Sequence, residues 1–194
     1  MSSTNGTVLD NEAYPTPVAV VESLLRHLNL RPGDRFLEPA KGEGNIYDRI
    51  LLPAEQKSWA EIRLGVDYLT ADLGQQDVII TNPPFSLTEQ FIQKSKTELA
   101  PDGTMVYLQR ANYLGTVKRV KFWEHVGFPN KHPVIVPRPR FIKGKGKSGD
   151  SCEYMWFIWD YGNRFPTIPL GMSHLITPGT TIPDMMIYRH GMAA

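Results

Sequence analysis

Strand and helix patterns alternate along the first two thirds of the chain, and this alternation most constrains the fold. Short apolar runs typical of buried strands are followed by turns and then by apolar residues at helical spacing. The pattern predicts a parallel sheet with helices on both faces. The expected strands are residues 35–40, 58–62, 77–81 and 104–109, and the expected helices are residues 14–30, 46–52, 86–100 and 116–126.

Two further strand patterns, residues 133–142 and 153–160, are joined by a short loop with no helical pattern. A connection this short cannot cross over, so the two strands are expected to form an antiparallel hairpin at the sheet edge. Prolines inside the first of them also favour an edge position or a bulge. The predicted fold class is an α/β doubly wound sheet that ends in an antiparallel β-hairpin.

The length and composition of the chain, 194 residues with ordinary apolar and charged content, indicate a single domain. Within it we expect a flexible leader (residues 1–13), a basic hairpin loop (138–149) and a Gly-, Pro- and Thr-rich tail without assigned structure (161–194). No apolar run is long enough to span a membrane, and the N-terminus lacks the features of a signal peptide. With a single cysteine, these features favour a cytoplasmic protein.

Positive charge is local rather than general in this sequence. The formal net charge is +1, yet residues 131–149 contain six basic residues and no acidic one. Such a patch can contact phosphates, although a solvated hairpin tip is the alternative reading. The histidines and the cysteine show no zinc-binding spacing, so no metal site is expected.

Unusual residues gather where three of the predicted strands end. Glu38 opens the stretch "EPAKGEGN" after the first strand, Glu61 ends the second, and "NPPF" (residues 82–85) ends the third. In a doubly wound sheet, ligands bind beyond the carboxyl ends of the strands, near the point where strand order reverses. The three stretches therefore predict one ligand pocket.

The "NPPF" stretch forms a stiff corner. Proline has no N–H to donate, so it ends the strand, and Asn82 is held extended because it precedes a proline. The corner presents one amide side chain, exposed carbonyl groups and one aromatic ring.

The glycine loop and its acidic neighbours suggest the ligand. Gly42 and Gly44 let the backbone approach a ligand closely, although a simple turn explains them equally well. Their spacing matches neither phosphate-binding glycine motif. A carboxylate at the end of the second strand suits a ribose diol, whereas Glu38 and Glu43 suit a cationic or amino-bearing ligand. S-adenosylmethionine carries a ribose, an amino group and a sulfonium.

Taken together, "EPAKGEGN" and "TNPPF" resemble the two signature motifs of amino-methyltransferases, most closely the N6-adenine DNA methyltransferases, including small phage-type enzymes. "YPTP" resembles the family's threonine-proline motif, "AEI" its ribose-binding acidic motif, and "GVDYL" the motif that touches the adenine of the cofactor. "RPRF" followed by "DSCEYMWFIW" resembles the edge hairpin of phage adenine methyltransferases. The motif order resembles the family's gamma arrangement, and the resemblance runs from Tyr14 to Asp160.

The resemblance implies a Rossmann-like class I methyltransferase fold and S-adenosylmethionine as the cofactor. Asp67 matches the motif that meets the cofactor's adenine better than Asp72 does, and Tyr14 either packs beside the cofactor or belongs to the leader. The implied cofactor-binding residues are Thr16, Pro17, Glu38, Pro39, Ala40, Gly42, Gly44, Glu61, Ile62, Asp67, Tyr68 and Asn82.

The resemblance also implies methyl transfer to the exocyclic N6 amino group of adenine in DNA, with Asn82, Pro83, Pro84 and Phe85 as the catalytic residues. The Asn82 side-chain oxygen and the Pro83 carbonyl can accept the amino hydrogens and stabilise the positive charge that develops on the nitrogen. Phe85 can stack on the target base, which must be flipped out of a duplex or already unpaired. Phe141 resembles a second aromatic that faces this base, or is a core residue.

DNA is the expected partner of a monomer or homodimer that would act in the host cytoplasm if it is phage-encoded. The 194 residues leave no room for a separate target-recognition domain, so the basic hairpin is expected to contact the DNA. Alternatives are an RNA methyltransferase acting on adenine N6 or guanine N2, a glutamine-amide methyltransferase, and a catalytically silent protein that binds cofactor and nucleic acid. The expected substrate-binding residues are Phe85, Phe141, Arg138, Arg140, Lys143, Lys145 and Lys147.

Overall fold

The computed structural model describes residues 14–141 and 151–182. Within these ranges, seven strands form one sheet in the order β2-β1-β3-β4-β6-β5-β7. The strands are β1 (Phe36–Glu38), β2 (Lys57–Trp59), β3 (Gln76–Thr81), β4 (Leu99–Arg110), β5 (Lys131–Val136), β6 (Tyr154–Asp160) and β7 (Gly171–Ile176). The α-helices are α1 (Val18–Leu25), α2 (Thr88–Glu98) and α3 (Val120–Val126), and short 3-10 helices are Tyr47–Arg49, Ala54–Gln56, Ile62–Leu64, Phe85–Leu87, Ala111–Tyr113 and Val117–Arg119.

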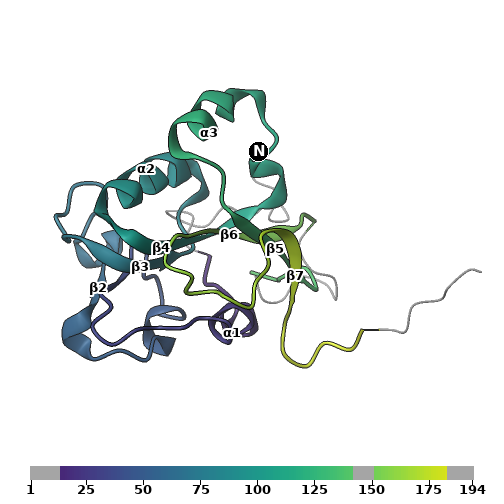
Figure 1. The fold of residues 1–194 in the computed structure, drawn as a ribbon, viewed down its shortest axis with the longest axis horizontal. Coiled ribbons are helices and arrows are strands. Elements are labelled where there is room, and N and C mark those ends of the chain that lie inside the picture. The colour runs from purple at the N-terminus through teal and green to yellow at the C-terminus, as the bar shows by residue number, and fades with distance from the viewer. Residues whose placement is uncertain (1–13, 142–150, 183–194) are drawn as a thin grey trace, which may run out of the picture.

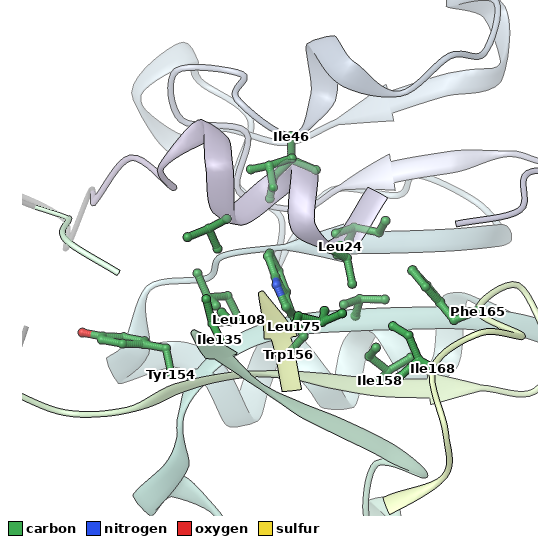
Figure 2. Close-up of a cluster of buried hydrophobic side chains, with 14 of the residues drawn as sticks. Leu24, Ile46, Leu108, Ile135, Tyr154, Trp156, Ile158, Phe165, Ile168 and Leu175 are labelled. Atoms are coloured by element: carbon green, nitrogen blue, oxygen red, sulfur yellow. The ribbon is translucent and has the colours of Figure 1, made fainter. Parts of the chain in front are cut away.

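Helices cover both faces of the sheet, as the alternating pattern predicts. Figure 1 shows α2 and α3 on one side and α1 on the other. Each face has its own apolar core. On the α1 side, Leu24 and Ile46 point toward Trp156, Leu108 and Leu175 of the sheet, as Figure 2 shows.

Strands β2, β1, β3 and β4 run parallel, and β6 pairs antiparallel with both β4 and β5. The α/β doubly wound fold and the antiparallel hairpin of β5 and β6 are therefore confirmed. The prediction that the hairpin lies at the sheet edge is wrong, because β7 pairs parallel with β5 and forms the edge instead.

The predicted tail contributes to the core in its described part. Phe165, Ile168 and Leu175 are buried against the α1 face. Arg164, of which 2% is exposed, forms two charged hydrogen bonds with Asp34, at 2.6 and 3.0 Å. The sequence left residues 161–194 unassigned, and of these the structure describes residues 161–182, which include strand β7.

Three local predictions also differ from the structure. The sequence places Thr16 to cap the first helix, but Pro17 holds the cap position, its carbonyl accepts the first helical N–H groups, and α1 begins at residue 18. The helix expected over residues 46–52 is a single 3-10 turn, because Lys57 Nζ binds the carbonyls of Tyr47 and Ile50 that a longer helix would use. Residues 101–103 (Pro-Asp-Gly) have the sequence of a turn between the expected helix 86–100 and the expected strand 104–109, but they lie inside β4, where the register with β3 shifts.

Candidate functional site

A cavity of about 450 Å³ lies beyond the carboxyl ends of β1, β2 and β3. This is where a doubly wound sheet binds its ligands, and the volume is that of a small-molecule pocket. Pro17 and Gly44 do not line it. Ten of the twelve predicted cofactor residues do line it: Thr16, Glu38, Pro39, Ala40, Gly42, Glu61, Ile62, Asp67, Tyr68 and Asn82.

Glu38 is the most buried acid of the cavity, with 2% of its surface exposed. Its carboxylate accepts one hydrogen bond, at 2.7 Å, from the backbone N–H of Tyr47. Burial raises the pKa of Glu38 well above its usual value, and this bond only partly offsets the effect. No cation forms an ion pair with Glu38 within the described ranges, so a ligand ammonium group would find an acceptor there.

The pKa of Glu61 is shifted in the opposite direction. Glu61 lies two residues beyond the end of β2, and its Oε2 accepts from the Gly42 N–H at 2.7 Å. Its Oε1 accepts from the Arg63 side chain at 2.9 Å. Burial pushes the pKa of Glu61 upward, but the hydrogen bonds from Arg63 and Gly42 outweigh it and lower the pKa. Glu61 therefore presents an ionised carboxylate that can accept hydroxyl hydrogens.

Glycine is required at the two positions of the loop for different structural reasons. Gly42 has φ +53° and turns its N–H toward Glu61, which closes the loop against the cavity. Gly44 has φ +83°, and a Cβ there would lie 2.8 Å from the Asp48 carboxylate. Gly44 thus allows the turn that follows, rather than an approach to a ligand.

Asp67 lines the cavity and Asp72 does not. The Asp67 side chain accepts a hydrogen bond from the Leu69 N–H at 3.0 Å, which fixes the turn that carries it. The next residue, Tyr68, points its hydroxyl away from the cavity to Ser95 (2.7 Å) and Glu98 (2.8 Å) on α2. Burial raises the pKa of Tyr68, so this hydroxyl stays protonated as it ties the turn to the helix.

The side chain of Asn82 is oriented by Tyr14, the residue that follows the predicted leader. Its Nδ2 donates to the backbone carbonyl of Tyr14 at 2.9 Å. Tyr14 is itself buried at the cavity wall. Because the amide nitrogen is engaged there, the amide oxygen lies on the other side of the planar group and serves as an acceptor. Sequence reasoning found Tyr14 as a candidate but missed this role, since a backbone carbonyl leaves no residue-type signal.

Phe85 is partly buried and belongs to an aromatic group beside the cavity. The guanidinium carbon of Arg110 lies 5.0 Å from the centre of its ring. Tyr154, at the start of β6, contacts Phe85 with ring centroids 6.2 Å apart and Phe141 with centroids 4.8 Å apart. Phe141 has 7% of its surface exposed and packs in the core.

Arg110 was missed by the sequence reasoning. It ends β4, on the same edge as the "NPPF" corner, and its Nε and Nη2 are buried without a hydrogen-bond partner among the described residues. A basic residue at the end of a strand that runs parallel to the "NPPF" strand is the signal that could have identified it.

Two of the hairpin residues that were predicted to contact DNA, Arg138 and Arg140, lie within the described ranges. Arg138 pairs with the exposed Glu153, and Arg140 is exposed. Lys143, Lys145 and Lys147 lie outside the described residues. Across residues 14–141 and 151–182, no cluster of three or more metal-ligating side chains occurs. In the same ranges, no helix has the length and apolar character needed to span a bilayer.

No protein-family model matches the chain, and no curated protein matches it. Among solved structures, the M protein of the type I restriction enzyme EcoKI matches with a TM-score of 0.56 and 15% identity, over 80% of this chain and 45% of that one. The type IIG restriction endonuclease BpuSI matches with a TM-score of 0.53 and 15% identity, over 77% and 26%.

A protein from Listeria monocytogenes, described as a class I S-adenosylmethionine-dependent methyltransferase, matches with a TM-score of 0.52 and 14% identity, over 96% of this chain and 66% of that one. The chain spans less than half the length of the restriction-system proteins that it matches. Together with the sheet order, these similarities establish its architecture: the chain has the α/β Rossmann-like fold of class I methyltransferases.

Proposed function

We propose that this protein transfers a methyl group from S-adenosylmethionine to the exocyclic N6 amino group of adenine in DNA. The observation that carries the proposal is the orientation of Asn82. Its amide nitrogen is held by the Tyr14 carbonyl at the wall of the cavity, which leaves its oxygen as a fixed acceptor beside the cavity. An acceptor held in this way is what an aromatic amino group needs if its hydrogens are to be bound during attack.

The cavity residues fit the cofactor. Glu38 offers a buried carboxylate to the amino group of the methionine arm, and Glu61 offers an ionised one to the ribose hydroxyls. Asp67 lies in the same cavity for the adenine ring. When bound, S-adenosylmethionine supplies an electrophilic methyl group on a positively charged sulfur.

The corner at residues 82–85 would handle the target base. The Asn82 oxygen and the Pro83 carbonyl accept the two amino hydrogens, which favours a localised lone pair on a nitrogen that otherwise conjugates with its ring. Their fixed dipoles stabilise the positive charge on the nitrogen as it attacks, and no reorganisation is needed at that moment. Phe85, held by Arg110, stacks on the base after it has left its helix.

Support for DNA as the substrate comes from three sources. The "NPPF" corner has phenylalanine, and the hairpin beside it is basic. Two of the structural neighbours are restriction-system proteins by name. The protein-amide and RNA alternatives remain outcomes of the test below.

The direct test is transfer of a tritiated methyl group to duplex DNA, single-stranded DNA, structured RNA and a protein extract, followed by nucleoside mass spectrometry. We expect N6-methyladenine in DNA. Label confined to RNA or protein would overturn the choice of substrate. Calorimetry with S-adenosylmethionine, run on the same preparation, separates a failure of binding from a failure of transfer.

A matched pair of Asn82 variants tests the mechanism. Asn82→Ala removes the acceptor, and we expect transfer to fall about 10²-fold or more, the usual cost of losing a preorganised electrostatic contact. Cofactor affinity should change far less. Asn82→Asp keeps an acceptor but loses the donor to Tyr14, so partial activity is expected. Full activity of Asn82→Ala would contradict the proposed role.

A further inference from the structure

We propose that residues 111–121, the connection between β4 and α3 together with the first two residues of α3, form a DNA-binding surface that contacts the phosphate backbone next to the target pocket. This inference rests on the proposed function, and it assigns a contact surface separate from the basic hairpin of residues 138–149. Its exposed basic residues are Lys118 and Lys121.

The position of the connection is set by the sheet. Because β3 and β4 are parallel, the residues that follow each of them emerge at the same edge. Residues 82–85 follow β3, and residues 111–121 follow β4. The contact between Arg110 and Phe85 joins the two segments, with 5.0 Å between the guanidinium carbon and the ring centre. DNA that delivers a base to the corner must therefore pass beside this connection.

The connection is anchored through Arg119. The Arg119 Nε bonds Glu89 on α2 at 3.0 Å, and its Nη1 bonds the Thr116 hydroxyl at 3.0 Å. Its guanidinium carbon also lies 3.7 Å from the centre of the Tyr113 ring. Arg119 is thus engaged by the protein, and it holds the turn in one position relative to α2.

The two lysines beside this anchor are exposed and form no ion pair within the described ranges. Residues 111–121 contain no acidic residue; the nearest acids are Glu89, which is paired with Arg119, and the exposed Glu124 on α3. Each lysine directly follows an exposed apolar residue in the chain, since Val117 is 90% and Val120 is 52% exposed. Unpaired cations around an exposed apolar tip fit a partner with phosphates outside and sugars and bases within.

Charges at the opposite edge of the sheet behave differently. Four ion pairs neutralise basic residues there: Arg31–Asp102, Arg35–Asp77, Lys131–Asp160 and Arg164–Asp34. Lys118 and Lys121 have no such carboxylate partner among the described residues, so their charges remain available to a partner.

The test compares two double variants that each remove two positive charges. Lys118→Ala/Lys121→Ala changes the proposed surface, and Arg31→Gln/Lys96→Ala changes the other end of the fold. Binding to a labelled DNA duplex is followed by fluorescence anisotropy across a series of salt concentrations. All four positions are partly or fully exposed, so thermal melting should confirm that both variants remain folded.

We expect the Lys118/Lys121 variant to bind at least about tenfold more weakly at low salt. The slope of log K against log[salt] should become shallower by about 1.8, because each phosphate contact contributes about 0.9. The control should match the wild type. Equal loss in both variants, wild-type binding by the lysine variant, or no DNA binding by the wild type would each overturn the surface. Lysine-dependent binding without methyl transfer would uphold the surface and overturn the proposed function.

Discussion

Glu38 illustrates, at the scale of a single residue, how a binding site is kept ready at the expense of stability. Its carboxyl is almost fully buried, and burial raises its pKa. The folded state therefore holds the proton more tightly than the unfolded state does. The contribution of Glu38 to stability is most favourable below its unfolded pKa, about 4.3. It declines as the pH rises from there toward the raised folded pKa.

Glu38→Gln should therefore stabilise the protein at neutral pH while weakening cofactor binding. The neutral amide removes the cost of a buried charge and keeps an oxygen for the Tyr47 N–H. A gain of about 1 kcal/mol would raise the melting temperature by about 2–4 °C, whereas affinity for S-adenosylmethionine should fall at least about tenfold. Melting curves and calorimetry test the two halves separately. Unchanged affinity would show that Glu38 does not meet the cofactor.

The pH dependence of cofactor binding gives a second check on Glu38. A ligand ammonium group favours the ionised carboxylate, so affinity of the wild type should rise with pH as Glu38 loses its proton. The Glu38→Gln variant should lack this rise. An identical pH profile in both proteins would mean that another group causes it.

Arg110 offers a prediction about the target base. Replacement by methionine keeps an apolar stem against Phe85 but removes the cation, whose attraction to a ring is about 0.5–2 kcal/mol. We expect kcat to fall about 2- to 30-fold with cofactor affinity unchanged. The variant removes two buried N–H donors without partners but also the hydrogen bond between Arg110 and Tyr154, so its stability should change by no more than about 1 kcal/mol. A large loss of stability would instead indicate a structural role.

At the scale of elements, the turn that carries Asp67 depends on α2. The Tyr68 hydroxyl bonds Ser95 and Glu98 of α2, and Lys94 of the same helix donates to the backbone carbonyl of Ala71 at 2.8 Å. Tyr68→Phe should lower the free energy of unfolding by about 1–2 kcal/mol, since it leaves polar groups with fewer partners. Cofactor affinity should fall with it.

Tyr161→Phe is the matched control, because Tyr161 is half exposed and its hydroxyl accepts a hydrogen bond from Lys96. Its effect should stay within about 0.5 kcal/mol. Urea denaturation of both variants makes the comparison, and an equal effect would argue against the proposed tie between the turn and α2.

Elements were predicted from sequence where their pattern is local. The buried runs of β3 and β6 and the helical spacing of Phe91 and Ile92 in α2 indicate a strand or a helix from the local sequence alone. Strand β7 does not, because its segment is short, alternates weakly and follows a Gly- and Pro-rich stretch. Its conformation is imposed by pairing with β5, a contact between distant parts of the chain. Because β7 was not predicted, the hairpin of β5 and β6 was placed at the sheet edge, which β7 occupies in the structure.

The position of the cavity could be predicted from the sequence. Nine of the ten candidate cofactor residues that line it, all except Thr16, lie at or after the ends of β1, β2 or β3, and strand ends are visible in sequence. The orientation of the side chains could not be predicted from the sequence. The bond from Asn82 to the Tyr14 carbonyl and the contact of Arg110 with Phe85 depend on how distant segments pack, and neither leaves a spacing in the sequence.

At the scale of the whole molecule, the edge opposite the pocket is held by buried ion pairs. Asp160 accepts from Lys131 Nζ at 2.6 Å, from the Thr104 hydroxyl at 2.8 Å, and from the backbone N–H groups of Arg164 and Phe165. Burial raises the pKa of Asp160, but these hydrogen bonds outweigh it and lower the pKa. Its contribution to stability is present above its unfolded pKa, about 3.9, and is lost as the pH falls toward the lower folded value.

Lys131→Met should cost about 3–5 kcal/mol at neutral pH, because it leaves the Asp160 carboxylate buried without its cation. The cost should shrink as the pH falls, because without Lys131 the buried Asp160 carboxylate takes up a proton more readily and the unpaired charge disappears. Arg31→Met, which breaks an exposed pair, should cost at most about 1 kcal/mol at either pH. Urea denaturation at pH 7 and pH 3.5 decides, and a pH-independent cost of Lys131→Met would exclude the ion pair as its cause.

The place of β6 in the sheet has a consequence for how the chain is made. Strand β4 pairs on one side with β3, but its other neighbour, β6, lies 44 to 56 residues further along the chain, from the Arg110–Tyr154 pair to the Thr104–Asp160 pair. At a synthesis rate of about 5–20 residues per second, one edge of β4 waits several seconds for its partner to be made. During that interval the nascent chain exposes Val106 and Leu108, both fully buried in the finished protein, on an unpaired strand. At high expression temperatures or on crowded ribosomes, we therefore expect protein to be lost through aggregation of the nascent chain rather than through unfolding of the completed protein.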